Sequence, residues 1–124
     1  MLDDAQLVAF VASTDLERSK AFYGGVLGLP VVEDSPFAAV FRTPNAMLRV
    51  TAVEGHAGAP YTVLGWDVAD IAARVQALAA AGVAFHRYDG MGQDEDGVWT
   101  APGGARVAWF SDPDGNTLSL TQHP

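Results

Sequence analysis

The alternation of apolar and polar positions is clearest near the end of the chain. Apolar residues give way to a turn-forming cluster at 111–116, and a strict alternation of period two follows it. Pro113 supplies a preset φ and Gly115 can adopt a positive φ, so the stretch predicts a strand, a tight turn and a second strand. A period of two places three small hydroxyl side chains on one face of that second strand, opposite its leucines. These three are Thr117, Ser119 and Thr121.

Short apolar runs elsewhere predict further strands, because runs of this length between turn signals are typical of buried strands. They lie at residues 7–11, 31–32, 37–41, 47–53, 61–68, 83–88, 98–100 and 106–110. The Glu-Gly-His-Ala-Gly-Ala-Pro stretch at 54–60 is the clearest linker.

Two segments show helical spacing, and each follows an aspartate suited to be an N-cap. The first begins after Asp15, and Gly24-Gly25 lies within it, so we expect that helix to weaken or end near Tyr23. The second begins after Asp70 and ends at Gly82, a glycine of the C′ type.

The order of these elements repeats along the chain. Asp15 and Asp70 are 55 positions apart (70 minus 15), and Gly28 and Gly82 are 54 apart (82 minus 28). A near-constant offset indicates an internal duplication. The sequence therefore predicts an α+β fold of two βαβββ modules, at about 5–54 and 61–122. Neither module alone covers both faces of its sheet, so we expect the two to pair within one domain or across a dimer.

Composition narrows the class of protein. The 124 residues are 49% hydrophobic and 18% charged, which is typical of one globular domain. Cysteine is absent, which excludes disulfides, thiolate metal sites and cysteine nucleophiles. The formal net charge of −8 argues against nucleic acid as a partner and suits a neutral or cationic small molecule.

The sequence also bears on location. No apolar run reaches the length of a membrane span, and the Met-Leu-Asp-Asp start lacks the basic and apolar regions of a signal peptide. We therefore expect a cytoplasmic protein with no membrane partner.

Several motifs resemble the vicinal oxygen chelate superfamily, which includes glyoxalase I, extradiol dioxygenases and bleomycin-resistance proteins. They span nearly the whole chain: Asp-Leu-Glu-Arg-Ser at 15–19, Phe-Tyr at 22–23, Leu-Gly-Leu at 27–29, Val-Ala-Asp-Ile at 68–71, Ala-Gly-Val at 81–83 and Phe-Ser-Asp-Pro-Asp-Gly-Asn at 110–116. The resemblance implies paired βαβββ modules that curl their sheets around a cleft, and a homodimer.

The resemblance also implies where a metal would be bound in the enzymes of the superfamily. Their ligand positions fall here on Val8, Val63 and Ser119, and a fourth falls among Met47, Arg49 and Thr51. None of these side chains is a good ligand for a divalent ion. We therefore expect no metal and no cofactor, as in the bleomycin-resistance proteins, which sequester antibiotics without chemistry.

The expected function is metal-independent binding of a small molecule, an antibiotic or a bulky metabolite, in a dimer cleft. Candidate ligand-binding residues are those expected on the cleft-facing sides of the strands or in a loop above them. They are Arg49, His86, Tyr88, Trp99, Trp109, Ser119 and Thr121.

Arg49 and the aromatic candidates each have an alternative interpretation that involves no ligand. Arg49 would orient a carboxylate or carbonyl group if Leu48 and Val50 pack under a helix, or else form an ion pair with Asp67 or Glu54. Aromatic candidates would stack on a planar or cationic ligand, or else pack in the core.

Their placement rests on strand parity. Trp109 has the opposite parity to Phe110, which we assign to the core, and His86 shares the parity of Tyr88. Trp99 follows an acidic loop and would close over a bound molecule.

Two other functions stay open. One is an enzyme of the superfamily, a lyase, isomerase or dioxygenase, with metal ligands at positions not identified above. The other is an interaction module whose cleft is filled by its own side chains.

Overall fold

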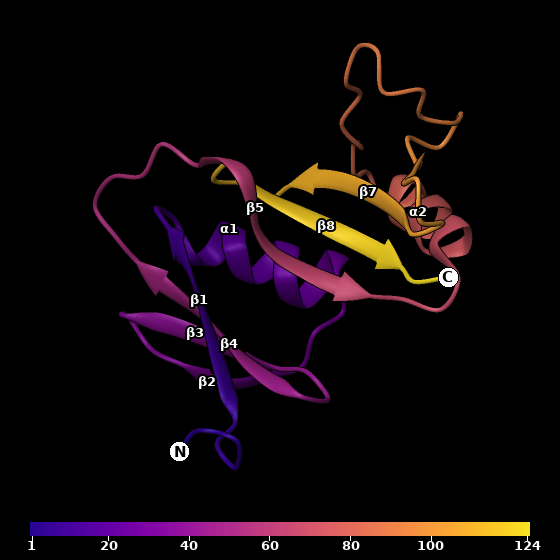
Figure 1. Cartoon of the computed structure of the whole chain (residues 1–124). Helices are drawn as coiled ribbons and strands as arrows, with labels where there is room; N and C mark the ends of the chain where they lie inside the picture. Colours follow the sequence, from indigo (N-terminus) through magenta and orange to yellow (C-terminus); the bar gives the residue numbers. More distant parts are fainter. The chain divides into compact units, whose positions relative to one another are not determined.

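A computed structural model describes all residues, 1–124. The chain forms two compact units, Met1–Ala57 and Gly58–Pro124 (Figure 1). The boundary between them falls inside the linker predicted at 54–60.

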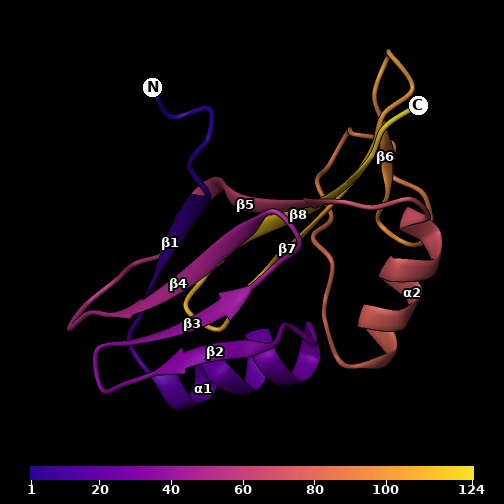
Figure 2. The same ribbon diagram turned by 90° about the horizontal axis from the view of Figure 1, so that it is seen from below.

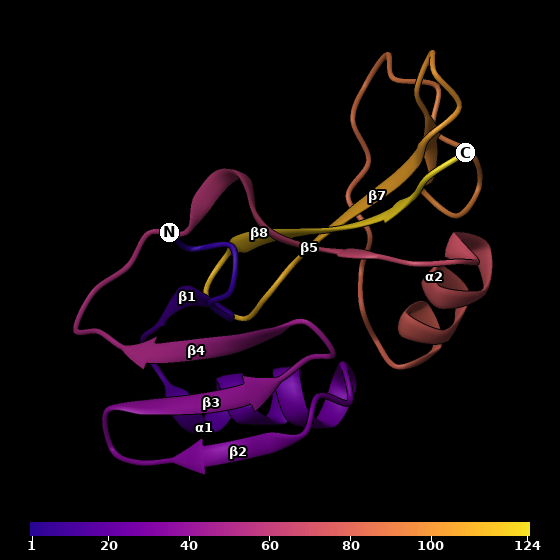
Figure 3. The ribbon, with the colours of Figure 1, turned by 60° about the horizontal axis from the view of Figure 1, so that its bottom comes forward.

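The first unit is a four-stranded mixed sheet with a helical segment on one face. Its strands lie in the order β1-β4-β3-β2, with β1 parallel to β4 and the other neighbours antiparallel. Figure 3 shows β4, β3 and β2 side by side with α1 behind them. The elements are β1 (Leu7–Ser13), α1 (Leu16–Lys20), a π-helix η1 (Ala21–Val26), β2 (Val31–Asp34), β3 (Ala38–Arg42) and β4 (Ala46–Ala52).

The second unit repeats this topology. Its strands lie in the order β5-β8-β7-β6, with β5 parallel to β8, and α2 lies beside the sheet (Figure 2). The elements are β5 (Ala59–Asp67), α2 (Ile71–Ala80), β6 (Trp99–Thr100), β7 (Arg106–Ser111) and β8 (Asn116–Gln122). The identical order confirms the predicted duplication and the α+β fold of two βαβββ modules.

Both helices begin as the sequence predicts. The carboxylates of Asp15 and Asp70 accept hydrogen bonds from the backbone N–H groups of Arg18 at 3.2 Å and Ala73 at 3.1 Å. Each bond satisfies one of the amide donors that the first turn of a helix leaves unpaired. The second helix is ten residues long, and no helix of the chain is both long and apolar enough to cross a lipid bilayer.

The second helix also ends as predicted. Gly82 has a φ of +99°. Its N–H donates to the carbonyl of Ala79 at 3.0 Å, and the N–H of Val83 donates to that of Leu78 at 3.0 Å. This pair of bonds is the Schellman motif, which glycine permits because it has no Cβ atom.

The glycine pair predicts that the first helix weakens or ends near Tyr23. Its regular α-helical part stops earlier, at Lys20, and the segment continues as the wider π-helix η1, after which the N–H of Leu27 donates to the carbonyl of Phe22 at 2.9 Å. Tyr23 is fully buried, with its ring 6.0 Å from that of Phe41. This tertiary packing outweighs the low helix propensity of Gly24-Gly25.

Each sheet packs one face against its own helical segment. In the first unit, the apolar residues buried between the sheet and the helical segment are Val11, Tyr23, Ala39, Phe41, Leu48 and Val50. Those of the second unit are Ile71, Val75, Ala108, Phe110, Leu118 and Leu120. Burial of each large apolar side chain contributes about 1.5–3 kcal/mol to folding.

The strand predicted at 83–88 is not formed. His86 makes one ladder-like bond there, from its N–H to the carbonyl of Trp109 at 2.8 Å. The N–H of Tyr88 instead donates to the side chain of Gln93 at 2.7 Å, and the Gln93 amide donates to the carbonyl of His86 at 2.9 Å. Because a side chain of the following loop takes these backbone groups, the segment stays irregular, and the outer edge of β7 is covered partly by His86 and partly by β6.

Candidate functional site

The candidate site lies on the face of the second sheet that is turned away from α2, called here the helix-free face. Trp109 is the register partner of Ser119, so the two side chains share one face. Phe110 pairs with Leu118 on the other face. Gln122, which shares the parity of Leu118, accepts a bond from the first amide of α2 at 2.9 Å, which places α2 on that other side. Strand parity therefore separates Trp109 from the core as predicted.

Four rings form an aromatic cluster on the helix-free face, defined as His86, Tyr88, Trp99 and Trp109. Trp109 is the central member, with its ring 5.6 Å from Tyr88 at an interplanar angle of 85° and 6.0 Å from Trp99 at 34°. The rings of His86 and Tyr88 are 6.0 Å apart at 81°. Such edge-to-face and tilted contacts are favourable arrangements for aromatic pairs.

Hydrogen bonds hold His86 at both ring nitrogens. Nε2 lies 2.8 Å from the hydroxyl oxygen of Ser111, and Nδ1 lies 3.1 Å from that of Tyr88. One hydroxyl donates and the other accepts when the imidazole is neutral. The imidazole therefore fixes the position of the Tyr88 ring relative to β7.

A pocket of about 280 Å³ lies next to this cluster. Its lining is mainly aromatic and apolar, with two threonines, and carries no charged side chain. The volume lies just below the range of about 300–1,000 Å³ that is usual for small-molecule sites. The lining residues are Pro60, Tyr61, Thr62, Tyr88, Met91, Trp109 and Thr117.

Hydrogen bonds within residues 87–98 connect the two ends of the loop that carries Tyr88 and Met91. The guanidinium of Arg87 donates to the backbone carbonyls of Asp94 and Glu95. The Asp94 carboxylate accepts from the N–H groups of Asp96 and Val98, each at 2.9 Å. These bonds link Arg87 to residues 94–98 across the loop, beside the aromatic cluster.

The structure brings most of the predicted ligand-binding residues together. Tyr88 and Trp109 line the pocket, and His86 and Trp99 contact them. Thr121 shares their face, as the register partner of Val107.

Ser119 shares the helix-free face but lies deeper. It is only 8% exposed, and its hydroxyl lies against Gly65. A Cβ atom at residue 65 would come within 2.7 Å of the Ser119 hydroxyl oxygen. It is not among the pocket-lining residues.

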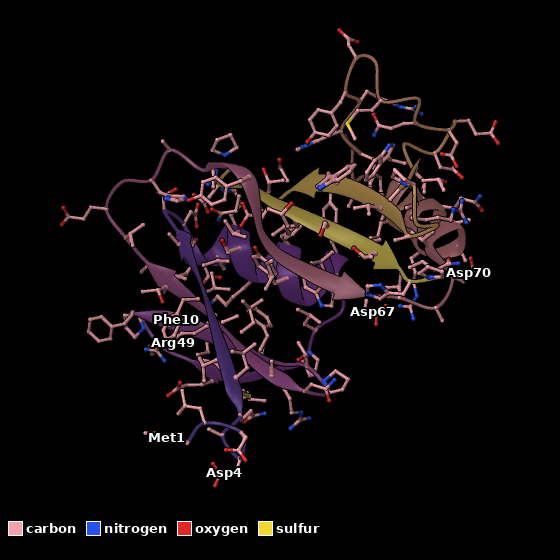
Figure 4. All side chains as sticks on the ribbon, in the orientation of Figure 1. Met1, Asp4, Phe10, Arg49, Asp67 and Asp70 are labelled. Atoms are coloured by element: carbon pink, nitrogen blue, oxygen red, sulfur yellow. The ribbon has the colours of Figure 1, made fainter.

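Arg49 lies in the first unit, on β4, next to its register partner Phe10 of β1 (Figure 4). Leu48 and Val50 are buried on the helix side, so Arg49 faces the opposite side, as expected. Its ion-pair partner is Glu33 at 3.5 Å, not Asp67 or Glu54 as proposed from the sequence. The reason is the strand order β4-β3-β2. Val40 of β3 pairs with Arg49 on one side and with Glu33 on the other, so the side chains of Arg49 and Glu33 share one face of the sheet.

Sequence reasoning missed several lining residues, above all Tyr61 and Met91. Two register irregularities in β5, between Ala59 and Thr62 and between Thr62 and Leu64, interrupt the period of two around Tyr61. Met91 lies in an irregular loop, where no periodicity exists. Only the apolar character of Met91 within an otherwise polar loop could have drawn attention to it.

The positions that would bind metal in the superfamily hold no metal-binding set. Val8 and Val63 are apolar and partly exposed, and Ser119 is the small hydroxyl already described. Within either unit, no group of three or more histidine, aspartate or glutamate side chains lies close enough to hold a metal ion.

Two βαβββ units with one shared strand order define a duplicated α+β protein of the glyoxalase type. Residues 6–120 match the family model of the Glyoxalase/Bleomycin resistance protein/Dioxygenase superfamily, and the chain belongs to that superfamily. No curated protein sequence matches the chain.

Solved structures with the same fold include proteins of differing roles. A superfamily member from Sphaerobacter thermophilus DSM 20745 is 23% identical with a TM-score of 0.78, over 99% of this chain and 100% of its own. TnmS3, an antibiotic binding protein from Streptomyces sp. CB03234, is 22% identical with a TM-score of 0.72, over 100% and 99%. The lactoylglutathione lyase of Agrobacterium tumefaciens is 18% identical with a TM-score of 0.74, over 96% and 93%. At these identities the likeness shows the fold alone.

Proposed function

We propose that this protein binds a bulky aromatic small molecule, an antibiotic or a metabolite, without a metal. The observation that carries the proposal is the contact of Tyr88, Trp99 and Trp109 on the helix-free face, directly beside a pocket with an uncharged lining. Ring faces of this kind stack on planar ligands, and each such contact adds about 0.5–1.5 kcal/mol beyond area burial.

The polar groups around the cluster suit orientation of a ligand rather than chemistry on it. The hydroxyl of Thr117 already donates to the carbonyl of Ala59 at 2.7 Å, and His86 uses both ring nitrogens on Ser111 and Tyr88. A largely apolar pocket with a few fixed polar groups is typical of small-molecule sites. That TnmS3 is an antibiotic binding protein supports an antibiotic as one ligand class.

The side chains at the ligand positions of the superfamily support the proposed metal independence. Valine offers no lone pair, and a single serine hydroxyl is a poor ligand without carboxylate or imidazole beside it. This donor set supports binding and gives no observation in favour of the lyase, isomerase or dioxygenase alternative.

A fluorescence screen tests the proposal. The chain has three tryptophans, so the Trp66→Phe variant leaves only Trp99 and Trp109 as indole emitters. Trp66 is removed because it lies on the α2 side of the sheet, as the register partner of Leu120, away from the candidate site. We expect a saturable quench or spectral shift on titration with members of a panel of planar aromatic compounds. No response to any compound would support the alternative in which the chain's own side chains fill the site.

A further inference from the structure

We propose that the pocket beside the aromatic cluster selects an organic cation, a substituted ammonium group carried on an apolar or aromatic body. This inference rests on the proposed function and adds the chemical class of the ligand.

The rings that line the pocket can attract a cation. Tyr88 and Trp109 meet edge to face at 85° with centroids 5.6 Å apart, and both line the pocket. Tyr61 and the polarisable thioether of Met91 line it as well. A cation within about 6 Å of several ring faces is attracted by the quadrupole of each ring, and tryptophan provides the strongest such face.

No positively charged side chain of the second unit competes for these rings. Residues 58–124 contain three arginines. Arg87 binds the carbonyls of Asp94 and Glu95, and Arg106 lies 3.6 Å from the Asp94 carboxylate. Arg74 belongs to α2, on the other side of the sheet. No guanidinium therefore occupies the ring faces.

The electrostatic field of the second unit also favours a cation. The same residues 58–124 contain eight aspartates and glutamates against these three arginines, a formal charge of −5. A field of this sign raises the local concentration of cations and lowers that of anions. A neutral ligand would gain nothing from it.

The lining also indicates which kind of cation fits. No carboxylate lines the pocket, so a primary ammonium would exchange its hydrogen bonds to water for those of a few neutral hydroxyl oxygens at most. A quaternary ammonium group has no such bonds to lose, and its methyl groups pack against ring faces and Met91. The preferred ligand is therefore a fully or largely substituted ammonium.

A pair of matched probes tests the inference on the full chain. (4-Hydroxyphenyl)trimethylammonium and 4-tert-butylphenol have the same shape and differ by one charge. We would titrate each into ¹⁵N-labelled protein and follow the indole N–H signals of the three tryptophans. We expect the cation to bind about 3- to 10-fold more tightly than the neutral probe, and to shift the signal of Trp109 while that of Trp66 stays in place.

Two variants at Tyr61 locate the effect. Tyr61 is 69% exposed, so its replacement should leave the fold unchanged. Tyr61→Leu removes one ring and should reduce the preference for the cation by about twofold, whereas Tyr61→Phe keeps the ring face and should keep the preference.

The outcomes separate this inference from the proposed function. Equal or tighter binding of the neutral probe overturns cation selectivity but leaves aromatic-ligand binding intact. A Trp109 signal that neither probe shifts also overturns it, while the aromatic panel judges the proposed function on its own. A full preference retained in Tyr61→Leu would show that this pocket is not the cation site.

Discussion

Gly65 and Ser119 lie opposite each other at the base of the helix-free face. The Ser119 hydroxyl occupies the space that a side chain at residue 65 would need, since a Cβ atom there would lie 2.7 Å from the oxygen. Gly65 is not among the glycines with a positive φ, so its backbone conformation does not by itself require glycine. Sterics against Ser119, not backbone strain, therefore explain the glycine.

A double-mutant cycle tests this contact. We expect Gly65→Ala to destabilise the protein by about 1–3 kcal/mol through overpacking, as measured by urea unfolding. In a Ser119→Ala background, which lacks the hydroxyl, the same change should cost at least about 1 kcal/mol less. Stabilisation by Gly65→Ala alone, as reduced chain entropy would produce, would contradict the proposed clash.

Among single residues, strand parity predicted the central ring of the aromatic cluster but not two of the residues that line the pocket, Tyr61 and Met91. A period of two was sufficient to predict the face on which Trp109 lies, because β7 and β8 pair without irregularity. It failed for Tyr61 because the two register shifts in β5 depend on pairing with β8, which no local pattern encodes. The predicted ion-pair partners of Arg49 were wrong for a similar reason, since Glu33 comes near Arg49 only when β2 joins the sheet.

At the scale of elements, the N-cap of α2 is a local feature with a measurable effect. Asp70→Ala removes the bond to the N–H of Ala73 and should cost about 1 kcal/mol of unfolding free energy. Asp67→Ala is the matched control, because it removes the same charge from a side chain that is 72% exposed and 4.0 Å from His123 (Figure 4). Its cost should stay within about 0.5 kcal/mol. Equal costs in chemical denaturation would mean that charge, not capping, is responsible.

Local signals account for most of the elements that were predicted correctly. The β7–β8 hairpin, the two aspartate caps and Gly82 each depend on a few neighbouring residues. Residues 83–88 have the β-branched and aromatic composition of a strand, yet the side chain of Gln93 binds the backbone of His86 and Tyr88. The outcome there depends on a loop closing back on the chain, which composition does not report.

At the scale of the whole molecule, the account predicts that binding needs no metal. Dialysis against EDTA should leave the affinity of a ligand found in the aromatic panel unchanged within about twofold, because the superfamily positions Val8, Val63 and Ser119 offer no donor set. Addition of Zn²⁺, Ni²⁺ or Mn²⁺ should have no effect either. A divalent metal near one per chain by elemental analysis, with binding lost on chelation, would support the enzyme alternative instead.

The homodimer stays a prediction, and one edge strand offers a place for it. The outer strand β1 exposes Leu7, Val8 and Phe10, with Phe10 65% exposed. Exposed apolar edge strands tend to pair or become covered. Light scattering should give a mass of about 26 kDa, twice the 13.0 kDa of the chain, and Phe10→Asp should shift it toward the single chain. A monomer in the wild type at tens of micromolar would contradict the dimer.

The affinity of one aromatic ligand for three versions of the protein tests the central claim most directly. Calorimetric titration would compare the wild type with Trp109→Leu, which removes the centre of the aromatic cluster, and with Trp66→Leu, which removes an indole from the α2 side of the same sheet. Circular dichroism would first establish that both variants fold. We predict that Trp109→Leu weakens binding by about tenfold or more, and that Trp66→Leu changes it by less than about twofold. Equal losses in the two variants, or a larger loss in Trp66→Leu, would contradict a ligand site on the helix-free face.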